Sequence, residues 1–232
     1  MKLFFKFFLF LFFFIISNSS FLYAKEFNAV YLIEVGTVNI GKLIWNIQIS
    51  KNDYKISIIL EDKGLLSGLY KFNGKYEASG LIFNKILKPL EYKQNWITNK
   101  KEKNVKIIFN NNSLAELLLF PEEKEHQRIQ YIGIKNFFDP LSSFLNILMG
   151  ENQSKTIDGR RTYLMIVDKS YKKDGANIRK VLIKNYMNIW SDHKRKDLEH
   201  IEIVQQSNGI IEVLPMIIKI KFKGLTFKLK KI

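Results

Sequence analysis

Beyond residue 24, apolar and polar residues alternate along much of the chain with a period of two. This is typical of strands with one buried and one solvated face. The clearest alternation covers residues 43–49 and 54–60, on either side of the turn-forming triplet Lys51-Asn52-Asp53. An apolar residue occupies every second position of each stretch. The pattern therefore predicts an antiparallel hairpin.

Near the end of the chain the alternation changes phase. Apolar residues hold the even positions over residues 218–222 and the odd positions over residues 225–229. One continuous strand cannot keep the same face buried through such a change. We therefore predict a tight turn or a bulge at Gly224, since glycine tolerates a positive φ.

Further strand-like runs bring the expected total to about ten strands. They include residues 29–35, 105–109, 163–167 and 178–183. The polar stretches 99–106 and 193–197 indicate loops between strands.

One segment carries the signals of a helix. Asp139 is a suitable N-cap, Pro140 fits the first helical position, and Gly150 fits the end. The apolar residues between them recur at helical spacing. We predict a short helix at about residues 139–149. Because so short a helix is unstable alone, it must pack on a sheet or cover the end of a barrel.

Together these elements predict an all-β fold with a minor α component, in which the strands form an antiparallel meander. The 232-residue chain contains no Cys, which excludes disulfides and thiolate chemistry. A mature chain of this size needs no disulfides to stabilise its core. We expect one β-rich domain over residues 25–232. Closure of the sheet removes exposed edges, so the barrel is expected to be closed or half-open.

The first 24 residues have the pattern of a signal peptide. Lys2 and Lys6 precede an unbroken apolar run over residues 7–16, and Ala24 provides a small residue at the expected cleavage site. An uncleaved anchor is the alternative, but the run is short for a membrane span. Without Cys, the protein cannot be a bacterial lipoprotein. We therefore expect an exported protein that resides in the periplasm.

The chain is strongly basic, with a formal net charge of +15. Only five of its 37 basic residues are Arg, the residue best suited to bidentate phosphate recognition. The many Lys, Ile and Asn residues also share A/T-rich codons, so codon bias can explain part of the charge. We therefore expect no nucleic-acid partner. The alternatives are a solvated Lys-rich surface and peripheral contact with an anionic membrane.

Catalytic signatures are absent from the sequence. It contains no nucleophile elbow, no phosphate-binding glycine loop and no His-Glu-x-x-His motif. The three His residues have no ligand spacing, so no metal and no cofactor are expected. The sequence therefore favours a protein that is not an enzyme.

Five residues are candidates for ligand contact. Arg160 and Arg161 follow a predicted Asp-Gly turn and could clamp an anion, or they could pair with neighbouring carboxylates. Trp45, Tyr163 and Trp190 could line an apolar cavity, or they could fill an ordinary core.

Several short motifs, taken in order, resemble a known family. They are Phe137-Phe138-Asp139-Pro140-Leu141-Ser142-Ser143, Gly159-Arg160-Arg161 with Tyr163, Trp190-Ser191-Asp192, Leu214-Pro215 and Gly224 to Leu229, together with Tyr31, Gly36 and Gly41. In this order they resemble the bacterial exported family catalogued as domain of unknown function 3108. The resemblance implies a β-rich protein in the periplasm of a Gram-negative bacterium. Members have no established activity, so it implies no catalytic residue.

These observations lead to two main hypotheses of function. In the first, the protein binds a lipid or other hydrophobic molecule in its interior, with Lys and Arg at the rim meeting an anionic head group. In the second, it is an envelope scaffold that binds a protein partner, for example through an exposed strand edge. A hydrolase is the third and weakest hypothesis.

Overall fold

In the computed structural model, thirteen strands and one helix account for most of the described chain. The structure describes residues 24–62, 72–190, 197–206 and 214–232. The helix is α2, Pro140–Leu148. The strands are β1 Lys25–Val35, β2 Val38–Ile49, β3 Asp53–Asp62, β4 Phe72–Phe83, β5 Ile86–Thr98, β6 Glu102–Asn110, β7 Ser113–Phe120, β8 Gln153–Ile157, β9 Arg161–Lys173, β10 Ala176–Asn188, β11 Leu198–Gln206, β12 Ile217–Phe222 and β13 Leu225–Lys231.

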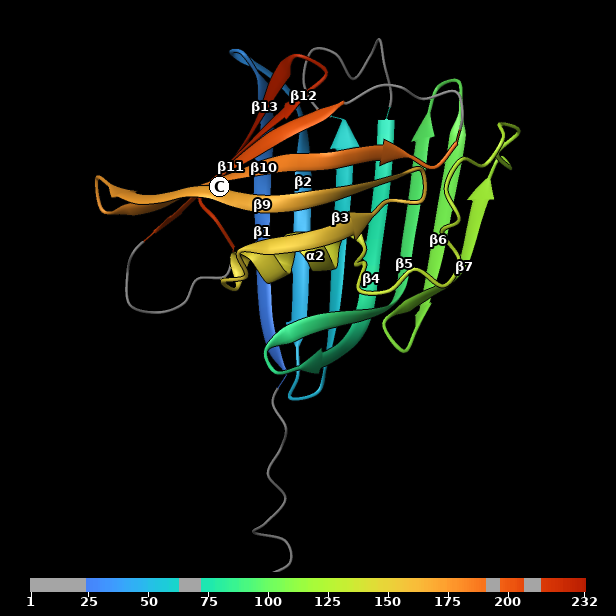
Figure 1. Ribbon diagram of the computed structural model, residues 1–232. Helices are drawn as coiled ribbons and strands as arrows, with labels where there is room; N and C mark the ends of the chain where they lie inside the picture. Colours follow the sequence, from blue (N-terminus) through green and yellow to red (C-terminus); the bar gives the residue numbers. More distant parts are fainter. Residues whose placement is uncertain (1–23, 63–71, 191–196, 207–213) are drawn as a thin grey trace, which may run out of the picture.

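All thirteen strands belong to one sheet, in the order β7-β6-β5-β4-β3-β2-β1-β13-β12-β11-β10-β9-β8. Two meanders, β1–β7 and β8–β13, are joined where β1 pairs with β13, and every pairing is antiparallel. In Figure 1, β1–β7 stand side by side and β8–β11 cross in front of them, with α2 between. The all-β fold with one short helix is confirmed. Because β7 and β8 remain sheet edges, the barrel is half-open rather than closed.

The hairpin predicted around residue 52 is present as β2 and β3. Its register places Trp45 opposite Ile58 and Ile47 opposite Ile56. Trp45, Ile47 and Ile56 are all buried, while the residues between them are more exposed. The alternation in the sequence therefore identified the inner face of the sheet.

The phase change at Gly224 corresponds to a tight turn between β12 and β13. Lys223 and Gly224 both have positive φ, at 50° and 76°. A two-residue turn of this kind matches the twist of the strands that it connects. The turn brings Ile218 opposite Leu229 and Ile220 opposite Phe227, so both strands present apolar residues to the same face.

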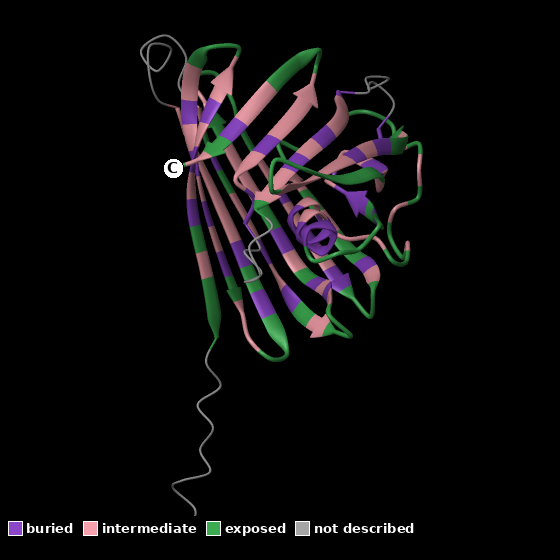
Figure 2. Ribbon diagram, turned by 90° about the vertical axis from the view of Figure 1, so that its left-hand side faces the viewer, coloured by how far each residue is buried: buried purple, intermediate pink, exposed green. Residues whose placement is uncertain are grey.

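The helix begins and ends as its residues predict. The Asp139 side chain accepts hydrogen bonds from the backbone N–H groups of Leu141 and Ser142, and Gly150 follows the helix with a positive φ. The helix packs against β8 on one side and against β4 and β5 on the other. Viewed along its axis in Figure 2, it is a buried plug between the two halves of the sheet.

Two details differ from the sequence-based expectation. The sequence predicts about ten strands, whereas the described residues form thirteen, among them β5, which continues past Pro89. The register shift between Ser79 and Gly80 accommodates this proline. The loop expected over residues 99–106 is shorter, because β6 already begins at Glu102.

Some expectations concern parts of the chain that the structure does not describe. Apart from Ala24, the expected signal peptide lies outside the described residues, as do most of the expected loop at 193–197 and residues 191–192 of the family motif. Among the described residues, no helix has the length and apolar character needed to span a membrane.

Candidate functional site

One half of the inner face is filled by the helix. Phe144 of α2 stacks on Trp45, with ring centroids 5.8 Å apart, and Leu145 beside it is fully buried. Asn146 exchanges two hydrogen bonds with the backbone of Leu87 in β5, at 2.8 and 3.2 Å. The structure therefore places Trp45, which is 1% exposed, in a packed core against the helix.

The other half of the inner face is hollow. An apolar pocket of about 610 Å³ lies between β1–β5 on one side and β12–β13 on the other. Its lining includes Leu43, Leu60, Phe72, Trp96, Ile220 and Phe227. We call this cavity the apolar pocket.

The shape of the apolar pocket depends on two stacked aromatic rings and a glycine. The rings of Phe72 and Trp96 stack with centroids 5.6 Å apart. Gly74 lies opposite Trp96 in the pairing of β4 with β5. A Cβ at Gly74 would lie 2.9 Å from the Tyr76 ring and 3.1 Å from the Trp96 ring. The missing side chain thus leaves space for Trp96 to lie along the wall.

A second, polar cavity of about 250 Å³ adjoins the first. Its lining includes Gln94, Trp96, Lys103, Asp158, Arg160 and Arg161. Trp96 therefore lines both cavities. We call this second cavity the polar recess.

The turn between β8 and β9 positions the two arginines of the polar recess. Asp158 accepts hydrogen bonds from the backbone N–H groups of Arg160 and Arg161, at 2.9 and 2.8 Å. Gly159 has a φ of +89°, and a Cβ there would lie 2.7 Å from the Val105 side chain. Glycine is required at this position because the turn packs closely against β6.

Both arginines have carboxylate partners. Arg160 forms an ion pair with Glu123, whose side chain is only 11% exposed. Arg161 lies 3.3 Å from Asp197 and 3.7 Å from Asp158. Burial raises the pKa of Asp158, and the charge of Arg161 opposes this shift. The arginine pair is thus a turn whose side chains bind neighbouring carboxylates at the wall of a cavity.

Tyr163 and Trp190 pack close to the β8–β9 turn that carries the two arginines. Tyr163 is buried and stacks on Tyr186, with ring centroids 5.9 Å apart. The Trp190 indole N–H donates a 3.3 Å hydrogen bond to the Gly159 carbonyl. The structure therefore brings Arg160, Arg161, Tyr163 and Trp190 together around the β8–β9 turn, whereas Trp45 lies with the helix.

Sequence reasoning missed Lys103 as a site residue. Lys103 belongs to β6 and lies directly opposite Trp96 in the antiparallel pairing with β5. The buried residues Val105, Ile107 and Phe109 follow it at every second position, so it shares their inner face. The alternation that includes Lys103 is present in the sequence, but the sequence also predicts a loop over residues 99–106, so Lys103 is not assigned to a strand there.

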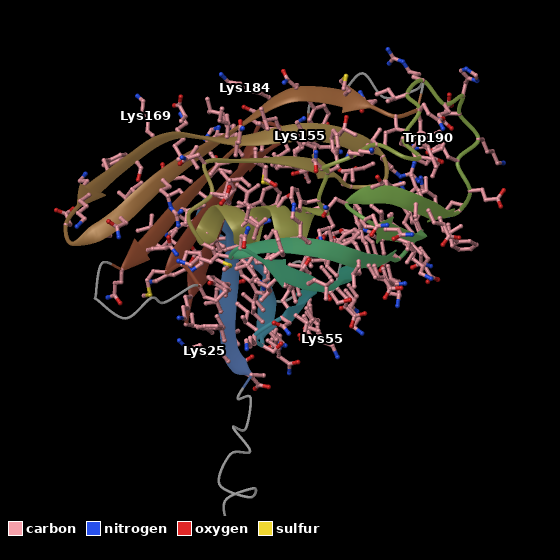
Figure 3. The ribbon with its side chains drawn as sticks, turned by 60° about the horizontal axis from the view of Figure 1, so that its bottom comes forward. Lys25, Lys55, Lys155, Lys169, Lys184 and Trp190 are labelled. Atoms are coloured by element: carbon pink, nitrogen blue, oxygen red, sulfur yellow. The ribbon has the colours of Figure 1, made fainter. Side chains whose placement is uncertain are left out.

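The remaining positive charge is spread over the surface. Lys25 and Lys55 are exposed toward the bottom of the molecule in Figure 3, and Lys169 and Lys184 are exposed toward its top, where Trp190 is also labelled. Peripheral contact with an anionic membrane stays a prediction.

Comparisons with known proteins agree with this architecture. The sequence model of the family described as "Protein of unknown function (DUF3108)" matches residues 30–170, which confirms the resemblance seen in the sequence. The chain is also similar to the crystal structure of a beta-barrel-like protein of domain of unknown function DUF1849 from Brucella abortus. The TM-score is 0.51 at 9% identity, and the alignment covers 90% of this chain and 96% of that chain. At this identity the likeness shows the fold alone. Among curated proteins, none matches this chain.

Proposed function

This chain belongs to the family described as protein of unknown function (DUF3108), and from that premise we propose that it binds a lipid-like or other hydrophobic molecule in the periplasm. The proposed binding is not catalytic. Export is supported by the first 24 residues, which contain two Lys residues, then an apolar run, and then a small residue at the expected cleavage site.

The apolar pocket is the observation that carries this proposal. Large contiguous apolar surfaces that remain open to solvent often mark ligand-binding grooves, so an open pocket lined almost entirely by apolar side chains is informative. A volume of about 610 Å³ lies within the range of pockets that hold small ligands. The helix fills the inner face beside Trp45 but leaves the face around Leu60 and Ile220 open. A hydrophobic ligand would complete the core there.

The ion pairs of the polar recess support binding rather than catalysis. Arg160 is engaged by Glu123, and Arg161 by Asp158 and Asp197. A general acid or base needs a free titratable group that can reach the substrate. The ion pairs of Glu123, Asp158 and Asp197 with the arginines instead stabilise the side chains that line the recess.

Two measurements test the proposal. The processed chain is purified from its own periplasm, and native mass spectrometry with solvent extraction identifies any bound molecule. The neutral dye N-phenyl-1-naphthylamine then probes the emptied pocket by fluorescence titration. We expect binding to the wild type and loss of binding in Ile220→Trp, which fills the pocket.

Leu118→Trp is the matched control, because Leu118 is half-exposed on β7 and does not line the apolar pocket. It should bind the dye as the wild type does. A wild-type protein that carries no molecule and binds no dye would contradict the proposal. Equal binding by Ile220→Trp would contradict the location.

The scaffold hypothesis has one observation in its favour. Strand β7 is an edge of the sheet, and Leu118 and Phe120 near its end are 50% and 59% exposed. Backbone hydrogen bonds from residues 133–136 cover only the beginning of β7 within the described residues. A partner strand could add to this edge. Leu118→Lys with Phe120→Lys should then abolish periplasmic cross-links, since charge blocks edge pairing. An unchanged cross-link pattern would contradict the scaffold hypothesis.

A further inference from the structure

We propose that the ligand of this protein is a single-chain anionic amphiphile, whose chain occupies the apolar pocket and whose head group binds Lys103 in the polar recess. This inference rests on the proposed function, and it adds the chemical class of the ligand and the residue that recognises it.

The two cavities meet at the side chain of Trp96, which belongs to the lining of both. Lys103 lies directly opposite it on the neighbouring strand, and side chains so placed are about 5 Å apart at their Cβ atoms. A ligand chain that leaves the apolar pocket along the Trp96 ring therefore arrives at the Lys103 ammonium group.

Within the described part of the chain, Lys103 is the cation of the recess that has no ion-pair partner. Arg160 pairs with Glu123, and Arg161 pairs with Asp158 and Asp197. Among the described residues, no carboxylate lies within ion-pair distance of Lys103. An incoming anion would supply the partner that this part of the structure does not provide.

The electrostatic surroundings of Lys103 also favour an anion. Lys103 is exposed, but partial desolvation lowers its pKa, and the positive charge of Arg160 adds to this effect, while Glu123 opposes it. The positive charges of Lys101 and Arg161 lower the pKa as well, so three cations act on Lys103 against the carboxylate of Glu123. A carboxylate or phosphate head group would reduce the repulsion between Lys103 and Arg160 and form a charge-assisted hydrogen bond.

The relative sizes of the cavities favour one chain with a compact head. The apolar pocket has about 610 Å³ and the polar recess about 250 Å³. The larger volume is lined by apolar side chains such as Leu43 and Phe227, and the smaller by charged ones. A fatty acid and a single-chain alkyl phosphate share this chemistry. A neutral hydrophobic molecule would leave the recess unused.

The test compares three probes that share one chain length. Dodecanoate, dodecyl phosphate and uncharged dodecan-1-ol each displace N-phenyl-1-naphthylamine from the full exported chain in a fluorescence titration. We expect wild type to bind at least one anionic probe about tenfold more tightly than dodecan-1-ol, the effect of one charge-assisted hydrogen bond. The tighter of the two anions identifies the head group as carboxylate or phosphate.

Lys103→Met should remove this preference, whereas Lys103→Arg should retain it. The matched control is Lys106→Met, because Lys106 lies on the same strand but faces outward, 3.7 Å from Glu91. It should keep the preference of the wild type. Circular dichroism verifies that each variant is folded.

The outcomes separate this inference from the function on which it rests. If no probe displaces the dye and the dye itself does not bind, the proposed function fails. If dodecan-1-ol binds as tightly as both anions, the pocket binds ligands but the inference of an anionic head group is wrong. If Lys103→Met and Lys106→Met lose the preference for anionic probes to the same extent, the inference is also wrong, because general surface charge would then explain the preference.

Discussion

Replacing Asp139 with Asn is expected to change how the stability of this protein depends on pH. Asp139 is completely buried, and one of its carboxyl oxygens accepts hydrogen bonds from the backbone N–H groups of Leu141 and Ser142, at 2.9 and 3.0 Å. The other oxygen has no hydrogen-bond partner among the described residues. Burial raises the pKa of Asp139 from 3.8 to about 6, although these hydrogen bonds oppose the shift.

The raised pKa fixes the sign of the effect. Between pH 3.8 and about 6, the folded protein keeps a proton on Asp139 that the unfolded chain releases. The contribution of Asp139 to stability is therefore fully present below pH 3.8 and is lost as the pH rises through about 6. A shift of roughly two pKa units corresponds to about 3 kcal/mol of unfolding free energy. Asn cannot ionise, so Asp139→Asn should lack this loss.

The measurement is urea unfolding followed by circular dichroism at a series of pH values from 4 to 7.5. The stability of Asp139→Asn relative to wild type should increase by roughly 3 kcal/mol across this range. The buried amide can cost about 1–3 kcal/mol at every pH, so the change with pH is the diagnostic quantity. Asn is as good an N-cap as Asp, whereas the control Asp139→Ala should show the same pH dependence at a stability lower by about 1 kcal/mol.

A stability difference between wild type and Asp139→Asn that does not vary with pH would refute this reasoning. So would a difference that shrinks as the pH rises. In either case Asp139 would not be the proton-binding group that burial in this core implies, and the helix N-terminus would be more hydrated than its contacts indicate.

Three further substitutions test packing, each by its free energy of unfolding in urea. Trp45→Ala removes the ring that stacks on α2 and should cost about 3–5 kcal/mol; a loss below 1 kcal/mol would contradict its place in the core. Gly80→Ala would place a Cβ 2.1 Å from the Lys88 carbonyl oxygen and should cost about 1–3 kcal/mol; an unchanged stability would contradict the close approach of β4 and β5 at this position. Arg179→Met removes hydrogen bonds to the last carbonyls of α2 and should cost about 1–3 kcal/mol; an unchanged stability would show that water replaces them.

Residues close together in the sequence determined the local elements of this protein. The alternation around residues 43–60 assigned Trp45 and Ile56 to the buried face, and the phase change located the turn at Gly224. Asp139 and Pro140 determined where the helix begins. These features could be predicted because a period of two, a turn and an N-cap each depend on residues only a few positions apart.

The site was decided by tertiary structure. Alternation assigns a side chain to a face of a strand, but it does not say which strand lies beside it. The pairing of β5 with β6 put Lys103 opposite Trp96, and the fold of the sheet brought Arg160 to the same recess from 57 residues further along the chain. The pairing of β1 with β13, which joins the two meanders, is equally non-local. Such contacts depend on how all the strands and the helix pack together, because only the assembled sheet determines which part of its inner face the helix fills and which part stays open.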